Sequence, residues 1–288
     1  MSMKFQYDCF PCMLRQAIEA VDFLQIKEEQ KRNIINGTMQ TLVNVNMELT
    51  ASEIAAIIHQ NIIQLADGRD PYKTAKKESL RKAFEWYAYA KDLIRNSTQP
   101  LATALKLCVA GNVIDFGPSS TFDLHETIET VLNEPFAEFA FEEFQRAMQE
   151  ANSIVFLADN AGETVFDRLL IEEMQRPLTY VVKKDIILND ATLLDAQQTD
   201  FPDYVTIKDN GSAIQGTVLS RCSNEFVAAF TSADMIISKG MANFETLAEE
   251  GMRTFFLLKI KCPYVAKMSD IPNGSFVLKQ GGMLEQQY

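Results

Sequence analysis

Apolar residues recur at spacings of three and four through the first 150 residues, which is the period of amphipathic helices. In one such segment Ile54, Ile58 and Ile62 lie between polar positions. Further helices are predicted over 72–94, over 101–110 with Gly111 and Asn112 closing it, and over 135–152. Residues 1–150 are therefore expected to form an all-helical region.

After Asn152 the pattern changes to short apolar runs separated by helical segments. The runs that predict strands are 154–158, 178–182, 204–207, 235–238 and 254–258, and helices are predicted from Thr164, near 219–231 and from Asn243. Strands that alternate with helices indicate right-handed crossover connections and a mainly parallel sheet. Residues 151–288 are therefore expected to form an α/β domain.

Composition narrows the range of partners and locations. The formal net charge of −12 argues against a nucleic-acid partner, because phosphate backbones are bound by basic surfaces. No apolar run approaches the roughly 18 residues of a membrane span, so no membrane association is expected. The first residues lack the apolar core of a secretion signal, and an odd number of cysteines is typical of reduced thiols. We therefore expect a cytoplasmic protein.

Polar side chains follow three of the apolar runs. Asp159 and Asn160 come directly after the first run, Asn189 and Asp190 follow a second, and Lys239 follows a third. Because ligands of open parallel sheets bind at the carboxyl ends of the strands, these groups are expected to meet in one site. Carboxylate and amide oxygens suit a hard cation such as Mg²⁺ or Mn²⁺, and a lysine beside the cation suits a phosphate.

Each of these groups also has a simpler interpretation. An aspartate or asparagine after a strand can cap the next helix, and an Asn-Asp pair is a common turn. Glu163 is either a first-turn charge that complements the helix dipole or a catalytic group. Lys239 alone would be a surface charge, but Gly240 permits close backbone approach and Asn243 would cap the following helix. The combination of all three groups favours a binding site.

In these segments the chain resembles the domain-of-unknown-function 89 family, whose members are also called damage-control or metal-dependent phosphatases. The matching segments are Asp-Asn-Ala-Gly-Glu at 159–163, Asn-Asp at 189–190 and Lys-Gly-x-x-Asn-Phe-Glu at 239–245. The resemblance extends to Gly-Asn-x-x-Asp at 111–115, to Asp-Pro-Tyr at 70–72 with Lys76, and to Cys-x-x-Cys at 9–12, which resembles a prokaryotic-type subgroup. It covers nearly the whole chain.

The resemblance implies a helical region that packs on a Rossmann-like, three-layer α/β/α domain and contributes to the substrate pocket. It also implies a divalent cation, Mg²⁺, Mn²⁺, Co²⁺ or Ni²⁺, held by residues matching Asp159, Asn160 and Asp190. Lys239 and Asn243 would lie beside the substrate phosphate. Asn112 and Asp115 would line the pocket, the alternative being a helix C-cap and a turn. The family hydrolyses phosphate esters of small metabolites, often sugar phosphates or damaged phosphometabolites.

These residues suit direct hydrolysis of a phosphate monoester. A bound cation would polarise the phosphoryl group and lower the pKa of an attacking water. Lys239 would stabilise charge on the equatorial oxygens. Asp159, Asp190 or Glu163, which we expect at the substrate, would accept the proton of the water. An aspartyl-phosphate is the alternative, but the Asp-x-Asp arrangement typical of such nucleophiles is absent, which favours attack by water.

Two other classes of function fit parts of the sequence. A Rossmann-like methyltransferase or nucleotide-binding protein would use Asp159 to hold a ribose, but the first strand–helix turn carries Gly162 in place of a full Gly-x-Gly-x-x-Gly. A non-catalytic metal or redox module would be built on Cys9 and Cys12, completed by distant cysteines. For this pair we favour buried structural thiols.

Overall fold

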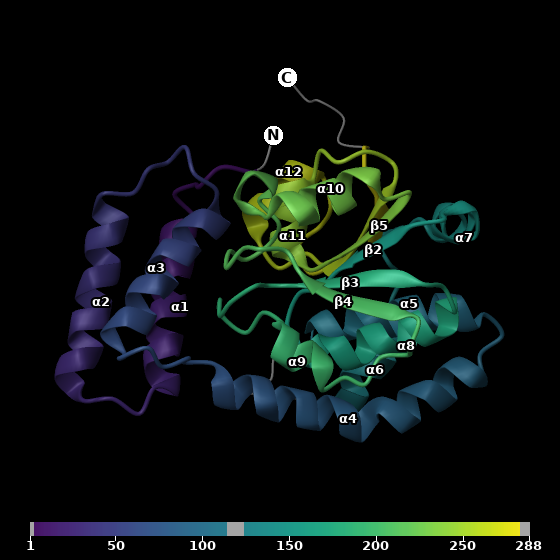
Figure 1. Ribbon diagram of the computed structural model, residues 1–288, viewed down its shortest axis with the longest axis horizontal. Helices are drawn as coiled ribbons and strands as arrows, with labels where there is room; N and C mark the ends of the chain where they lie inside the picture. The colour runs from purple at the N-terminus through teal and green to yellow at the C-terminus, as the bar shows by residue number, and fades with distance from the viewer. Residues whose placement is uncertain (1–2, 114–123, 283–288) are drawn as a thin grey trace.

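The computed structural model describes residues 3–113 and 124–282. Three helices, α1 (Cys9–Phe23), α2 (Glu28–Val43) and α3 (Ala51–Leu65), form a bundle with its own apolar core at the left of Figure 1. From the bundle, α4 (Lys73–Arg95) runs along the rest of the molecule, where α5 (Pro100–Val113) and α6 (Leu124–Asn133) join it. Among the described helices, none has the length and apolar character needed to cross a membrane.

The rest of the chain is built on one seven-stranded sheet. Its strands are β1 (Glu138–Phe139), β2 (Ile154–Leu157), β3 (Leu178–Val182), β4 (Val205–Asp209), β5 (Met235–Lys239), β6 (Thr254–Lys259) and β7 (Phe276–Gln280). Their order across the sheet is β1-β7-β6-β5-β2-β3-β4, and every neighbouring pair is parallel except β6 with β7. The predicted mainly parallel α/β domain is therefore confirmed.

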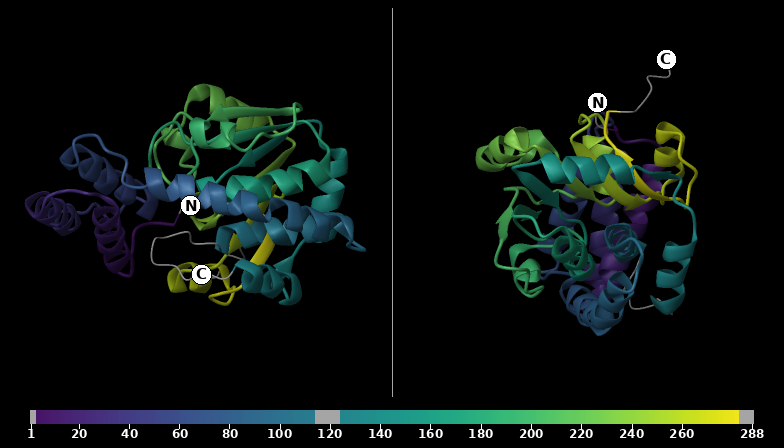
Figure 2. Two further views of the ribbon diagram at one scale, coloured as in Figure 1. Left: turned by 90° about the horizontal axis from the view of Figure 1, so that it is seen from below. Right: turned by 90° about the vertical axis from the view of Figure 1, so that its right-hand side faces the viewer.

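Helices cover both faces of the sheet (Figure 2). The side chains of Ile154 and Phe156 enter one core, shared with α4, α5, α6 and α8 (Thr164–Met174), whereas Val155 and Leu157 enter a second core on the opposite face. The second core is closed by α10 (Asn224–Ser232), α11 (Met241–Leu247) and α12 (Pro263–Ser269). Because both faces of β2 are covered, an uninterrupted apolar run at this strand is what the sheet requires.

The order of the strands places a topological switch point at the end of β2. This strand lies between β3 and β5, and the chain adds β3 and β4 on one side before it crosses to β5 and β6 on the other. The connections from β2 and from β5 therefore lead away from each other. Such a switch point is where open α/β sheets bind their ligands.

Two predicted helices have different limits in the structure. The helix predicted over 135–152 is wrong in its first part, because Ala137 and Ala140 donate backbone hydrogen bonds to Phe276 and Leu278 and so place β1 beside β7; α7 (Phe141–Glu150) follows. The helix predicted over 101–110 continues to Val113. Gly111 does not close it but permits close packing on α8, since a Cβ there would lie 3.0 Å from the Cβ of Phe166.

The apolar residues directly before Asn189 form no strand. After β3 the chain continues as a loop in which Ile187 and Leu188 pack into the core of the α1–α3 bundle. Leu188 adopts a left-handed conformation with φ +48°, which turns the chain back toward the sheet. The loop thereby connects the helical bundle to the end of β2.

His59 gives the bundle a dependence of stability on pH. It is 1% exposed on α3, and burial lowers its pKa to about 4. The unfolded chain binds this proton below about pH 6.5, whereas the folded chain does so only near pH 4. We therefore expect His59 to reduce the free energy of unfolding by up to roughly 3 kcal/mol as the pH falls through that window. Denaturant titrations at pH 7 and pH 4.5 should show a smaller decrease for His59→Phe than for the wild type; equal decreases would contradict the assignment.

Candidate active site

Asp159 and Asp190 meet at the end of β2, although 31 positions separate them in the chain. Ala191 donates its backbone N–H to the carbonyl of Asp159 at 2.8 Å, and Ala161 donates to the carbonyl of Asn189 at 2.9 Å. These bonds join the loop after β3 to the segment after β2, with Asn160 and Asp190 paired as an isolated bridge. The sequence-predicted pair of strand-end groups is therefore brought together, by loop pairing rather than by two strand ends.

Both carboxyl groups are buried in the protein. Burial, reinforced by the Glu163 and Asp190 carboxylates, raises the pKa of Asp159 well above its ordinary value. Burial also raises the pKa of Asp190 to about 7, against the effect of Lys183 and Lys76. A carboxylate in such a place is stable only beside a compensating positive charge.

Asp190 is the group that most clearly lacks a partner. Within the described part of the chain no donor makes a hydrogen bond to either of its carboxylate oxygens, and the side chain is fully buried. The Lys183 ammonium lies 3.9 Å from one oxygen, which is beyond hydrogen-bond distance. An unsatisfied buried carboxylate of this kind fits a ligand to a hard cation.

Asn160 is oriented by its neighbour. Its side-chain amide donates to Oε1 of Glu163 at 2.8 Å, which leaves the amide carbonyl oxygen for another partner. The donor set at this point thus comprises the carboxylates of Asp159 and Asp190 and this carbonyl oxygen. No three His, Cys, Asp or Glu side chains of the described residues are grouped to hold a metal ion. A ligand set of two carboxylates and one amide suits Mg²⁺ or Mn²⁺ better than zinc.

Lys239, predicted to contact phosphate, occupies a different environment from the expected one. It ends β5 with 0% exposure, and its ammonium donates to Oε2 of Glu163 at 2.9 Å and to Oδ1 of Asp167 at 2.6 Å. Burial opposes its charge, but Asp167 and Glu163 together raise the pKa of Lys239 well above its ordinary value. In this structure Lys239 therefore faces two carboxylates and not an open phosphate site.

Asp167 is the main residue of this region that sequence reasoning missed. Its carboxylate accepts the hydrogen bond from Lys239 described above. It also accepts one from the Tyr180 hydroxyl at 2.6 Å and one from the Cys108 thiol at 3.1 Å. The residue is fully buried one helical turn after Glu163, so both carboxylates lie on one side of the chain. The available signal was the spacing of four positions between Glu163 and Asp167, which places two acidic residues on the same side of a predicted helix.

Asn243 also differs from its predicted role. The N-cap of α11 is Gly240, so the expectation that Asn243 caps the helix is wrong. The buried Asn243 amide donates to the carbonyls of Ala158 and Lys239, at 3.1 Å and 2.7 Å, and accepts from the Thr217 hydroxyl. These hydrogen bonds connect the ends of β2 and β5. The predicted contact of Asn243 with a substrate phosphate is not tested by the structure.

Gly240 allows the backbone to approach the Asp159 carboxylate. Its φ is +78°, and a Cβ there would lie 1.9 Å from Oδ2 of Asp159. Gly240→Ala is expected to displace Asp159 and lower the affinity for Mn²⁺ by at least about tenfold. Gly68→Ala is the matched control, since Gly68 has the same φ of +78° but open space around it. Both should lose about 1 kcal/mol or more of stability, and calorimetric Mn²⁺ titrations that do not distinguish them would contradict the prediction.

The remaining predicted pocket residues are less informative. Asn112 lies within α5, and its side chain is not among those described. Asp115 lies outside the described residues. Both stay predictions from the family resemblance.

The cysteines are all free. Burial raises the pKa of Cys9 and of Cys12, and the Cys262 thiol adds to both effects, so these three lie near one another. Cys108 lies apart from these three and donates its thiol hydrogen to Oδ1 of Asp167. Burial raises the pKa of Cys108 as well. Cys12 is exposed and Cys9 is only partly buried, so the expectation that both are buried structural thiols is wrong. Their raised pKa values nevertheless make them poor nucleophiles at neutral pH, which does not favour a redox pair.

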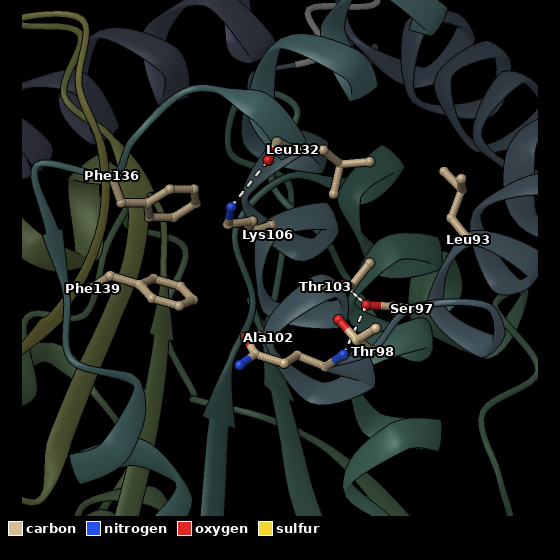
Figure 3. Close-up of a pocket in the computed structure, with 10 residues that line it drawn as sticks. Leu93, Ser97, Thr98, Ala102, Thr103, Lys106, Leu132, Phe136 and Phe139 are labelled. Carbon is tan, nitrogen blue, oxygen red and sulfur yellow. Dashed lines mark hydrogen bonds between the residues drawn. The ribbon is translucent and has the colours of Figure 1, made fainter.

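A cavity of about 440 Å³ lies at the first turns of α5, between Lys106, Phe136 and Phe139 (Figure 3). Lys106 donates to the carbonyl of Leu132 at 3.0 Å. None of the strand-end residues lines this cavity. The chemistry of the donor set, and not the size of a cavity, therefore identifies the candidate active site.

Comparison with known proteins gives a consistent result. Residues 5–277 match the family model of the damage-control phosphatase ARMT1-like domain. A damage-control phosphatase of Pyrococcus horikoshii is 33% identical over 286 residues, 96% of this chain and 97% of that protein. An uncharacterized protein of Methanocaldococcus jannaschii is 31% identical over 293 residues, 96% of this chain and 95% of that one. The crystal structure of a DUF89 family protein from Pyrococcus horikoshii aligns with a TM-score of 0.88 at 30% identity, and covers 97% of this chain and 99% of that one.

Proposed function

Because the chain belongs to the damage-control phosphatase family with an ARMT1-like domain, and is thus a phosphatase, we propose that it hydrolyses phosphate monoesters of a small metabolite. The substrate class is a sugar phosphate or a damaged phosphometabolite. A divalent cation, Mg²⁺, Mn²⁺, Co²⁺ or Ni²⁺, is held by Asp159, Asn160 and Asp190. The observation that carries the proposal is the buried Asp190 carboxylate, which has no hydrogen-bond partner among the described residues and lies against Asp159 at the switch point of the sheet.

The bound cation would polarise the phosphoryl group and lower the pKa of an attacking water. The residues around the site orient the groups that would hold the cation. Glu163 accepts from Asn160 with one oxygen and from Lys239 with the other, so it fixes the ligand amide and does not act as a free base. We therefore assign the proton of the attacking water to one of the two ligand carboxylates, Asp159 or Asp190. Direct attack by water stays the preferred route, and an acid-stable phosphoryl-enzyme would overturn it.

Lys239 receives a supporting role in this proposal. Its positive charge compensates Glu163 and Asp167, which would otherwise be two adjacent buried anions. By holding Glu163 it also holds the Asn160 amide in the orientation that presents oxygen to the cation. Ligands positioned by a second layer of hydrogen bonds bind metals more tightly, typically by 10- to 100-fold.

The helical region supports the same site. α4 packs against η1 (Ala161–Glu163), and Lys76 of α4 makes a buried ion pair with Asp195 at 3.0 Å. Asp195 in turn accepts from the backbone and hydroxyl of Thr192, two residues after Asp190. We propose that α4 thereby forms one wall of the substrate pocket, in line with the expected contribution of residues 1–150.

The test is phosphate release from a chromogenic phosphate ester and from a panel of sugar and nucleotide phosphates. Bound metal is first removed from the protein with a chelator. Mg²⁺, Mn²⁺, Co²⁺ or Ni²⁺ is then added back, one metal to each sample. We expect no release without metal and release with at least one of the four. Absence of release with every metal and ester, from protein that binds metal, would overturn the proposed function.

A further inference from the structure

We propose that Lys183 binds the phosphate of the substrate beside the cation, a role that the sequence had suggested for Lys239. This inference rests on the proposed function, because it concerns the same site. It follows from a comparison of the buried lysines and of the charges that compensate each one.

Four lysines are buried in the described part of the chain: Lys76, Lys183, Lys239 and Lys279. Three of them have a carboxylate oxygen within 3.0 Å, supplied by Asp195, by Asp167 and Glu163, and by Glu138 respectively. Lys183 does not, since its ion pair with Asp190 measures 3.9 Å. A buried ammonium without a close counter-charge is costly, so this position fits an anionic ligand.

The cation of the proposed function would leave the positive charge of Lys183 still less compensated. Asp190 is both the nearest carboxylate to Lys183 and a proposed ligand of the cation. Once Asp190 is bound to a divalent cation, its charge no longer compensates the lysine. A phosphate group placed between the cation and Lys183 would restore the balance, because it carries two negative charges and several acceptor oxygens.

The surroundings hold the lysine in place for this contact. Its backbone N–H donates to the carbonyl of Ala191 at 2.9 Å, so Lys183 lies in the same paired loop as Asp190. Its ammonium donates one hydrogen bond to the carbonyl of Gly216. Gly216 has φ +72°, and a Cβ there would lie 2.4 Å from the carbonyl oxygen of Ala242, so this carbonyl is held by close backbone packing. Two further N–H groups of the ammonium remain for a ligand.

The experiment measures metal binding and phosphate binding separately. Mn²⁺ affinity is determined by calorimetry, and inorganic phosphate, the reaction product, is then titrated into the Mn²⁺-loaded protein. Lys183→Met should keep Mn²⁺ affinity within about threefold and weaken phosphate binding by about 10- to 100-fold, as expected for a charged hydrogen bond. KM should rise for the ester, and Lys183→Arg should restore phosphate binding in part. Lys184→Met, at an exposed neighbouring lysine, is the control and should bind phosphate as the wild type does.

Lys183→Gln provides a second variant that retains a donor for the Gly216 carbonyl, in case the methionine variant does not fold. Phosphate binding at wild-type strength in either folded variant would overturn the inference, as would equal losses of Mn²⁺ and phosphate affinity. Failure of the proposed function is distinguishable, because wild-type protein would then bind metal but release no phosphate from any ester.

Discussion

Replacement of Asp190 by alanine is expected to lower phosphatase turnover by about a thousandfold or more, because loss of cation stabilisation of the transition state corresponds to ~4 kcal/mol. The same change should not destabilise the metal-free protein. Asp190 is a buried carboxylate without a hydrogen bond from the described residues, so its removal relieves a cost of burial that offsets the loss of its 3.9 Å ion pair with Lys183. Few residues combine loss of activity with unchanged or increased stability, and this combination marks a ligand position.

The measurement pairs turnover with thermal unfolding in the presence of chelator. Asp190→Asn should also lose activity, since it keeps the shape of the side chain and removes the charge. Asp185→Ala is the control: this aspartate is exposed in the same loop and should stay within about 0.5 kcal/mol of wild-type stability with turnover unchanged. A variant at Asp190 that binds Mn²⁺ normally would contradict the site.

Lys239→Met is expected to have the largest effect on stability, a loss of about 3–5 kcal/mol. The substitution leaves Glu163 and Asp167 as adjacent buried acids without the ammonium that lies 2.9 Å and 2.6 Å from them. Activity should fall with it, because Glu163 would no longer hold the Asn160 amide.

Urea titrations would quantify this loss beside the control Lys208→Met. Lys208 forms an exposed ion pair with Glu225 at 2.8 Å, and such surface pairs contribute about 0–1 kcal/mol. If the two variants unfolded at the same urea concentration, Glu163 and Asp167 would have to be neutral in the folded protein.

Local sequence patterns predicted the parts of the site that follow directly from β2 and β5. The apolar runs at 154–158 and 235–238 are strands covered on both faces, so the polar residues after them had to lie at one edge of the sheet. The position of Asn189 and Asp190 after another apolar run indicated the third group, and the family resemblance supported it.

The parts that were missed depend on contacts between distant segments. Asp190 is placed by loop pairing with the end of β2, and Tyr180 and Cys108 reach Asp167 from different elements. β7 was missed because it runs antiparallel to β6 and so departs from the repeated parallel crossovers that the other strands follow. No periodicity within a single segment encodes such pairings.

The packing of Ile187 and Leu188 into the core of the α1–α3 bundle has a consequence for how the enzyme loses activity on heating. These residues directly precede Asn189 and Asp190, so partial melting of the bundle would release the ligand loop while the sheet is still intact. Local openings of this kind need less free energy than global unfolding. Inactivation would then begin below the temperature at which the α/β domain melts, and bound metal would delay it by holding the loop closed.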